Sequence, residues 1–352
     1  MKQSSQRDVG RGPEAWSHGA QDGLAQGGQR LLAHTISDSS AVRQYLPAAR
    51  GFIEFGRKHE LACGTWVQLD EAMLQYLGQM CYVDKKNVQQ GVLAVNGVVY
   101  LYPNASREMP QSWRALKGWS IASITAEGQP VAMETLACME DYLRNLGTDE
   151  GIQAADCMPL AVDGYLREQD LFQLRVEDVL LQDNAEGTRV ATLLLGRGER
   201  GERCKSGRDQ GVVMDEPYSA EILEKRVREA EAKCFGPKVG ARDRRAKARI
   251  FTIKADAYRR LWKIAALAVT GNKEGAGVPH SARHTGATRD MTLGYRTVEQ
   301  VMKRGRWKAL SSVNRYAKPH AWYQAMSKQS DEVLERGALL LAARAPRATK
   351  LV

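Results

Sequence analysis

Apolar residues recur at spacings of three and four over most of this chain, while β-rich stretches are few and short. Before residue 125 the helical spacing appears in four segments, at 42–55, 69–80, 88–102 and 113–124. Four amphipathic segments in so short a stretch predict a small bundle of helices. Gly128, Gln129 and Pro130 then interrupt the pattern, and we place a domain boundary there.

The rest of the chain mixes both periodicities. Short β-rich runs predict a small antiparallel sheet of two hairpins, at 176–181, 188–195 and 211–214. Helical spacing recurs at 133–146, 167–174, 219–235, 255–269, 283–293, 297–304 and 321–343. We therefore expect a mainly α protein with a small antiparallel β-sheet, an α+β fold. It has four parts: a flexible leader at 1–34, a helical domain at 35–126, a mixed domain at 127–320, and a C-terminal helix and tail at 321–352.

The charge is strongly basic and unevenly placed. The 352 residues hold 51 Lys and Arg against 41 Asp and Glu, a net charge of +10. Residues 225–260 carry 13 basic and four acidic residues, 197–208 carry five and two, and 303–318 carry six and none. One such cluster is most simply a solvated helix face. Three clusters in one domain favour contact with a phosphate backbone.

Several protein classes are excluded by what the sequence lacks. No apolar run approaches the ~20 residues that span a membrane, and the first thirty residues hold no apolar segment of a secretory signal. The six cysteines lie at least 18 residues apart, so no zinc-binding pair is visible and we expect free thiols in an intracellular compartment. His280 and His284 lack the neighbouring Glu of a metalloprotease motif. We expect no membrane association, no metal and no cofactor.

A set of chemically active residues lies in four segments. These are Gly164-Tyr165-Leu166-Arg167, Cys204-Lys205-Ser206-Gly207-Arg208, His280-Ser281-Ala282-Arg283-His284, and the stretch from Arg304-Gly305-Arg306-Trp307 to Asn314-Arg315-Tyr316. His280 and Arg283 are three residues apart, which places both on one face of a helix. Lys205 falls on the turn between two predicted strands.

These residue types suit phosphoryl transfer to a tyrosine. Two guanidiniums, from Arg167 and Arg283, can hold the charged oxygens of a phosphodiester. A tyrosine with an ordinary pKa of about 10 needs a base or a cationic site in order to attack. A lysine such as Lys205 can protonate the leaving oxygen. Cationic side chains then take the role that Mg²⁺ has in other phosphoryl-transfer sites.

The motifs resemble those of the tyrosine recombinases, or phage-type integrases, from about residue 40 to residue 320. That family has an Arg, a Lys on a β-hairpin, His-x-x-Arg, a His or Trp, and a nucleophilic Tyr in this order. The resemblance implies the catalytic set Arg167, Lys205, His280, Arg283, Trp307 and Tyr316. It also implies supporting roles for Asp170 and His284. Asp170 stands three residues after Arg167, where the family commonly has Glu, and its carboxylate would orient Arg167 or His280. The step of nine residues from Trp307 to Tyr316 is the family's usual spacing.

Two positions depart from the family pattern. Gly164-Tyr165 replaces the usual Thr-Gly before Leu-Arg, and Trp307 stands where histidine is more common. The indole N–H of Trp307 can still donate to a phosphate oxygen. These departures bear on which subgroup of the family the chain resembles more than on the chemistry, because all six catalytic residue types are present.

The resemblance implies an enzyme that breaks and rejoins double-stranded DNA. Its function would be site-specific recombination or integration for a mobile element, through a 3′-phosphotyrosine on Tyr316. It would act as a homotetramer on DNA through the C-terminal helix, in a nucleus or a bacterial cytoplasm, with 35–126 as the core-binding domain. The helix packing in cis is nearly as strong an alternative.

Other interpretations stay open. The chain is alternatively a catalytically silent DNA-binding protein on the same scaffold, or an enzyme like the type IB topoisomerases. Taken singly, Arg167 has an ordinary explanation as an ion pair, and Tyr323 is an alternative nucleophile. The hairpin that carries Lys205 also offers Arg200, Arg203 and Arg208.

Overall fold

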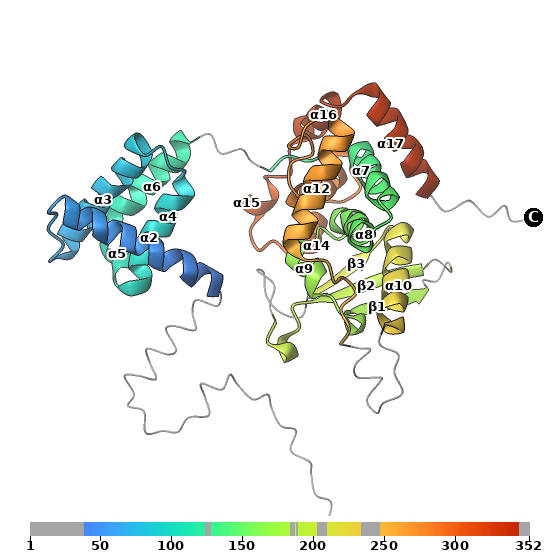
Figure 1. Cartoon of the computed structure of the whole chain (residues 1–352), viewed down its shortest axis with the longest axis horizontal. Helices are drawn as coiled ribbons and strands as arrows, with labels where there is room; N and C mark the ends of the chain where they lie inside the picture. The colour runs from blue at the N-terminus through green and yellow to red at the C-terminus, as the bar shows by residue number, and fades with distance from the viewer. Residues whose placement is uncertain are drawn as a thin grey trace, which may run out of the picture. The chain divides into compact units, whose positions relative to one another are not determined.

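The computed structural model describes residues 39–123, 128–183, 187, 189–202, 210–233 and 247–344. The chain divides into two compact units, residues 1–126 and 127–352, which are coloured from blue to red in Figure 1. No helix among the described residues is both long enough and apolar enough to cross a membrane.

The first unit is a bundle of helices. Its elements are α2 (Ser39–Lys58), α3 (Trp66–Gly78), the short π-helix η2 (Gln79–Val83), α4 (Val88–Leu101), α5 (Ala105–Glu108) and α6 (Pro110–Ala122). A capping box starts α3, because Thr65 and Gln68 each accept the other's backbone N–H. The buried carboxylate of Asp70 accepts the backbone N–H groups of Gln111 and Ser112, which ties α3 to the start of α6. Apolar side chains from these helices pack together and form the core of the unit.

The second unit is mostly helical, with a small sheet at one side of it next to α10 (Figure 1). Its helices are α7 (Met133–Asn145), α8 (Asp149–Asp163), α9 (Glu168–Gln173), α10 (Pro217–Ala232), α12 (Ala255–Thr270), α13 (His280–Thr292), α14 (Val298–Gly305), α15 (Leu310–Val313), α16 (Pro319–Ser327) and α17 (Asp331–Arg344). The strands are β1 (Val179–Asp183), β2 (Arg189–Leu195) and β3 (Gln210–Met214), antiparallel in the order β1-β2-β3. The expected fold class, mainly α with a small antiparallel sheet, is confirmed.

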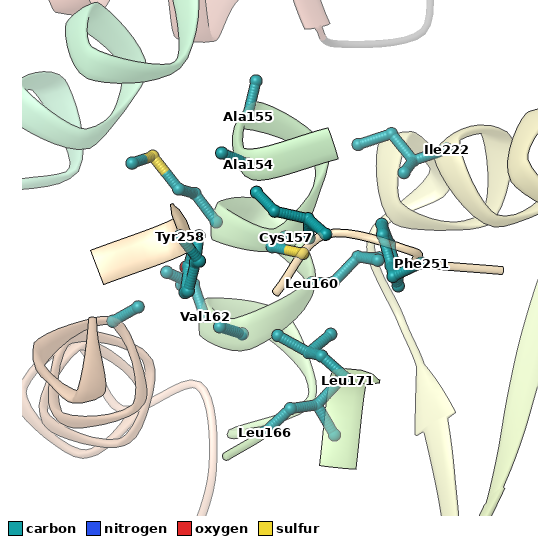
Figure 2. Close-up of a cluster of buried hydrophobic side chains, with 14 of the residues drawn as sticks. Ala154, Ala155, Cys157, Leu160, Val162, Leu166, Leu171, Ile222, Phe251 and Tyr258 are labelled. Atoms are coloured by element: carbon teal, nitrogen blue, oxygen red, sulfur yellow. The ribbon is translucent and has the colours of Figure 1, made fainter. Parts of the chain in front are cut away.

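Helix α8 runs through the centre of this unit. Figure 2 shows its side chains Ala154, Cys157 and Leu160 among neighbours from other elements, including Phe251 and Tyr258. Because nearly every side chain of α8 is buried, the helix is held on all sides and its C-terminal end is fixed. The residues that follow α8 lead directly into the candidate site.

The predicted helix at 321–343 is in fact two helices, α16 and α17, because 328–330 break the helical run. Helix α17 packs against α7 of the same chain. A Cβ added to Gly337 would overlap the backbone of Glu134, so the two helices approach closely. Arg336 pairs with Asp141, and Arg344 pairs with Glu140 on α7. In this chain the C-terminal helix therefore packs in cis.

Candidate active site

Arg167 is positioned by the turn that follows α8. The chain passes through Tyr165, whose φ of 45° is rare for a residue with a side chain, and Arg167 then occupies the N-cap position of α9. The Asp170 carboxylate accepts the backbone N–H of Arg167 at 2.9 Å and lies 4.0 Å from its Nη1. This Nη1 is buried and makes no hydrogen bond with any described residue. A buried donor of this kind suits a ligand oxygen.

Arg283 lies on α13 and is fully buried. Its Nη1 donates to the backbone carbonyl of Tyr165, and its Nη2 donates to that of Gly305 at 2.6 Å. Burial, together with the positive charges of Arg167 and Arg306, lowers the pKa of Arg283 to about 10. The side chain is still a cation at neutral pH, and a nearby anion would stabilise its charge.

Arg306 is a site residue that the motif-based assignment missed. It ends α14 in the left-handed conformation, with a φ of 57°, and its side chain is 4% exposed. Its Nη2 donates to Asp170 at 2.6 Å and to the Tyr165 carbonyl at 3.3 Å. The one sequence signal was its place in the Gly-Arg-Trp motif, where only Trp307 was given a role.

Four aromatic rings form a row beside these arginines. The ring centroids are 5.1 Å apart for His280 and His284, 4.8 Å for His284 and Tyr316, and 4.6 Å for Tyr316 and Trp307. His280 is exposed at the start of α13, whereas Tyr316, just after α15, is only 5% exposed. A Cβ on Gly305 would overlap the indole of Trp307, so glycine allows the ring to lie flat there.

A second network holds the turn that carries Tyr165. Its hydroxyl donates to Asp290 at 2.5 Å, and burial and the Asp290 charge hold the pKa of Tyr165 well above the ordinary value. Asp290 also binds Arg289 and Arg296. Because Tyr165 is anchored at its hydroxyl and buried around its ring, its left-handed backbone is maintained.

The electrostatic balance of the site favours an anion. Among the described residues, the guanidiniums of Arg167, Arg283 and Arg306 lie around one carboxylate, that of Asp170. Like charges buried together disfavour one another, and a phosphate or sulfate group relieves this repulsion. No group of three or more His, Cys, Asp or Glu side chains in the described part of the chain has the arrangement of a metal site.

The structure brings together every predicted site residue that it describes. Arg167 and Asp170 come from the start of α9, the three residues of the His-x-x-Arg-His motif from α13, and Trp307 and Tyr316 from the segments after α14 and α15. The predicted Lys205 lies outside the described residues, as do two of its alternatives, Arg203 and Arg208.

Two alternatives named from the sequence have different surroundings. Arg200 is paired with Glu177, Asp178 and Glu202, so its charge is neutralised within the fold. Tyr323, on α16, is 59% exposed, in contrast to the enclosed Tyr316. The turn after β2 nevertheless reaches the site, because Gly196, Arg200 and Glu202 line a small cavity with Asp170.

Comparison with known proteins gives similar solved structures only. No protein-family model and no curated protein matches the chain. XerH site-specific recombinase, bound to palindromic difH substrate in a post-cleavage complex, is 13% identical with a TM-score of 0.46, covering 75% of this chain and 70% of that chain. The Tn1549 transposon integrase, residues 82–397 in complex with circular intermediate DNA, is 14% identical with a TM-score of 0.46, covering 70% and 80%. XerA recombinase is 13% identical with a TM-score of 0.36, covering 91% and 98%.

These solved structures are recombinases and an integrase by name, the class of protein that the sequence motifs resemble. With identities of 13% to 14%, they do not assign a role to any residue of this chain.

Proposed function

We propose that this protein breaks and rejoins double-stranded DNA through a covalent bond to Tyr316, as a site-specific recombinase or integrase acting inside the cell. One observation carries the proposal: Tyr316 and Arg283 both pack on the ring of Trp307. The centroids of the Tyr316 and Trp307 rings are 4.6 Å apart, and the guanidinium carbon of Arg283 lies 4.5 Å from the Trp307 centroid. A phosphate held by Arg283 would therefore lie close to the tyrosine. Proximity of a nucleophile to its electrophile is a large part of phosphoryl-transfer catalysis.

In the proposed reaction the Tyr316 oxygen forms a bond to the scissile phosphorus, and the bond from phosphorus to the 5′-oxygen breaks. Arg167 and Arg283 bind the non-bridging oxygens, where negative charge develops. His280 accepts the tyrosine proton or positions the phosphate, and Lys205 gives a proton to the leaving 5′-oxygen. The phosphotyrosine keeps the bond energy, so a 5′-hydroxyl can reverse the step and rejoin the strand.

Two observations support an anionic substrate. The buried Nη1 of Arg167 makes no hydrogen bond with a described residue, and the described residues of the site include three guanidiniums and one carboxylate. Both features favour a group with several acceptor oxygens. The silent alternative, a DNA-binding protein without chemistry, does not need a tyrosine enclosed by His284 and Trp307.

The proposal extends to assembly. A homotetramer in which α17 moves from α7 of its own chain to a neighbouring chain would break the pairs of Arg336 with Asp141 and of Arg344 with Glu140. The pair of Arg336 with Asp141 is partly exposed and contributes only about 0–1 kcal/mol. Glu140 is buried, so loss of Arg344 from that carboxylate costs more.

The test is trapping of the intermediate. The full-length protein is incubated with a pool of duplexes that carry a random core and a nick, so that a short 5′-hydroxyl fragment escapes after cleavage. We expect a covalent adduct that survives denaturant, is attached to a 3′-phosphate, disappears in Tyr316→Phe and persists in Tyr323→Phe. Adduct formation by Tyr316→Phe, or none by the wild type, would contradict the proposal.

A further inference from the structure

Four non-glycine residues in the described part of the chain have a positive φ, and two of them meet within the candidate site. These are Tyr165, with a φ of 45°, and Arg306, with a φ of 57°. The Nη2 of Arg306 donates to the carbonyl of Tyr165 at 3.3 Å. A glycine would adopt the conformation of Arg306 without strain, and a helix commonly ends on glycine there. A residue that keeps its side chain in this conformation is expected to use it.

The contacts of Arg306 show what the side chain does. It joins the end of α14 to α9, because its guanidinium donates to the Asp170 carboxylate at 2.6 Å. The same carboxylate accepts the backbone N–H of Arg167. It also shares the Tyr165 carbonyl with Arg283, whose other nitrogen binds the Gly305 carbonyl. The two phosphate-binding arginines of the proposed function are thus connected through Arg306.

We propose that Arg306 is a positioning residue, which locks Asp170 and the Tyr165 carbonyl so that Arg167 and Arg283 are held at a fixed separation for one phosphate group. This inference rests on the proposed function for the identity of the phosphate, but the lock itself concerns the free protein. Arg306 acts through its neighbours: its guanidinium orients the carboxylate that orients Arg167.

A role in positioning differs from a role of charge alone. Asp170→Asn removes a negative charge from the site, so a purely electrostatic role predicts tighter binding of an anion. Arg306→Lys keeps the positive charge but loses the planar guanidinium that reaches two acceptors, so a purely electrostatic role predicts unchanged binding. Positioning predicts weaker binding in both variants, because Arg167 loses its fixed orientation.

The probe is inorganic sulfate, titrated calorimetrically into the full-length protein at low ionic strength. The binding component that disappears in Arg167→Ala reports this site. We expect Asp170→Asn and Arg306→Lys each to weaken that component by about tenfold or more, which corresponds to the loss of one charge-assisted hydrogen bond. The double variant should bind no more weakly than the worse single variant, because both break the same link.

Asp156→Asn is the matched control. Asp156 is also a buried carboxylate bound by two arginines, Arg144 and Arg226, but it lies in the core of the unit. We expect this variant to melt earlier and to bind sulfate as the wild type does. If Arg306→Lys does not fold, Asp170→Asn alone decides the question.

The outcomes separate the two proposals. Unchanged or tighter sulfate binding in folded Asp170→Asn would overturn the positioning role while leaving the proposed chemistry in place. Weaker binding in both variants, with no Tyr316 adduct on DNA, would uphold the lock and overturn the chemistry. Absence of any sulfate component dependent on Arg167 would overturn both.

Discussion

The guanidinium of Arg283 lies over the indole ring of Trp307, 4.5 Å from the ring centroid. Tyr316 packs on the same ring, so Trp307 holds a cation and the proposed nucleophile together. From sequence, Trp307 was expected to donate its indole N–H to a phosphate oxygen. The geometry gives it a second task, that of a stacking surface, and the two tasks can be separated by mutation.

Trp307→Phe keeps an aromatic face and removes the indole N–H, whereas Trp307→Ala removes both. A desolvated cation–π contact is worth about 2 kcal/mol and an aromatic pair about 1 kcal/mol. We therefore expect the rate of Tyr316 adduct formation to fall by about 100-fold in Trp307→Ala. The Phe variant should stay within about tenfold of the wild type. Equal losses in both variants would show that the N–H, and not stacking, is what the site needs.

Gly305→Ala tests the placement of the same ring. Its Cβ would overlap the indole of Trp307, so the ring must shift. We expect unfolding to become easier by about 1–3 kcal/mol, the usual effect of overpacking, and adduct formation to slow by at least about tenfold. Urea denaturation and the trapping assay measure these effects.

Gly118→Ala is the control for glycine replacement. Gly118 lies on α6 with open space around the position of a Cβ. Alanine there should stabilise the protein by about 0.5–1 kcal/mol. If Gly305→Ala also left both stability and adduct formation unchanged, the close packing of Trp307 on Gly305 would be wrong.

Two buried tyrosines differ in whether their hydroxyl is hydrogen bonded. Tyr165 donates to Asp290, whereas the hydroxyl of Tyr258 has no partner among the described residues. We expect Tyr165→Phe to lower the free energy of unfolding by about 1–3 kcal/mol, because a buried bond to a carboxylate is lost. Tyr258→Phe should be neutral or stabilising, since it removes a polar group that burial disfavours. A larger loss in Tyr258→Phe, measured by urea denaturation, would reverse this interpretation.

The stability should fall in alkaline solution partly through Tyr218. Its hydroxyl donates to Glu140, and burial and the Glu140 charge raise the pKa of Tyr218 to about 12. The unfolded chain releases this proton near its ordinary pKa of about 10, so the contribution is complete below pH 10 and is lost by about pH 12. Melting curves should show a smaller loss over this range for Tyr218→Phe than for the wild type. An equal loss would remove Tyr218 as a contributor.

Much of the fold follows from local patterns. The helix expected at 88–102 and the strands expected at 188–195 and 211–214 appear almost as predicted, because they show clear periodicity. The strand expected at 176–181 instead begins at Val179, after a 3-10 turn at Val176–Asp178. Helix α8 was not predicted. It is buried on nearly all sides and contains Pro159, so it shows neither an amphipathic stripe nor an uninterrupted helical composition. Only the surrounding elements make it a helix at the centre of a unit.

The sequence predicted which residues form the candidate site, but not the hydrogen bonds that connect them. Fixed spacings placed His280 and Arg283 on one helix face and Tyr316 nine residues after Trp307. Arg306 was missed because its partners, Asp170 and the Tyr165 carbonyl, are 136 and 141 residues away in the chain. A side chain that acts through a backbone carbonyl leaves no motif of its own. The prediction for Lys205 stays a prediction.

The most direct measurement is the position of the DNA-linked residue. The wild-type adduct is trapped on the nicked duplex pool, digested with trypsin and nuclease, and sequenced by tandem mass spectrometry. We predict a nucleotide attached to Tyr316 and to no other residue. A nucleotide on Tyr323 or on any other side chain, or an intact unmodified Tyr316 peptide in every adduct, would contradict the account.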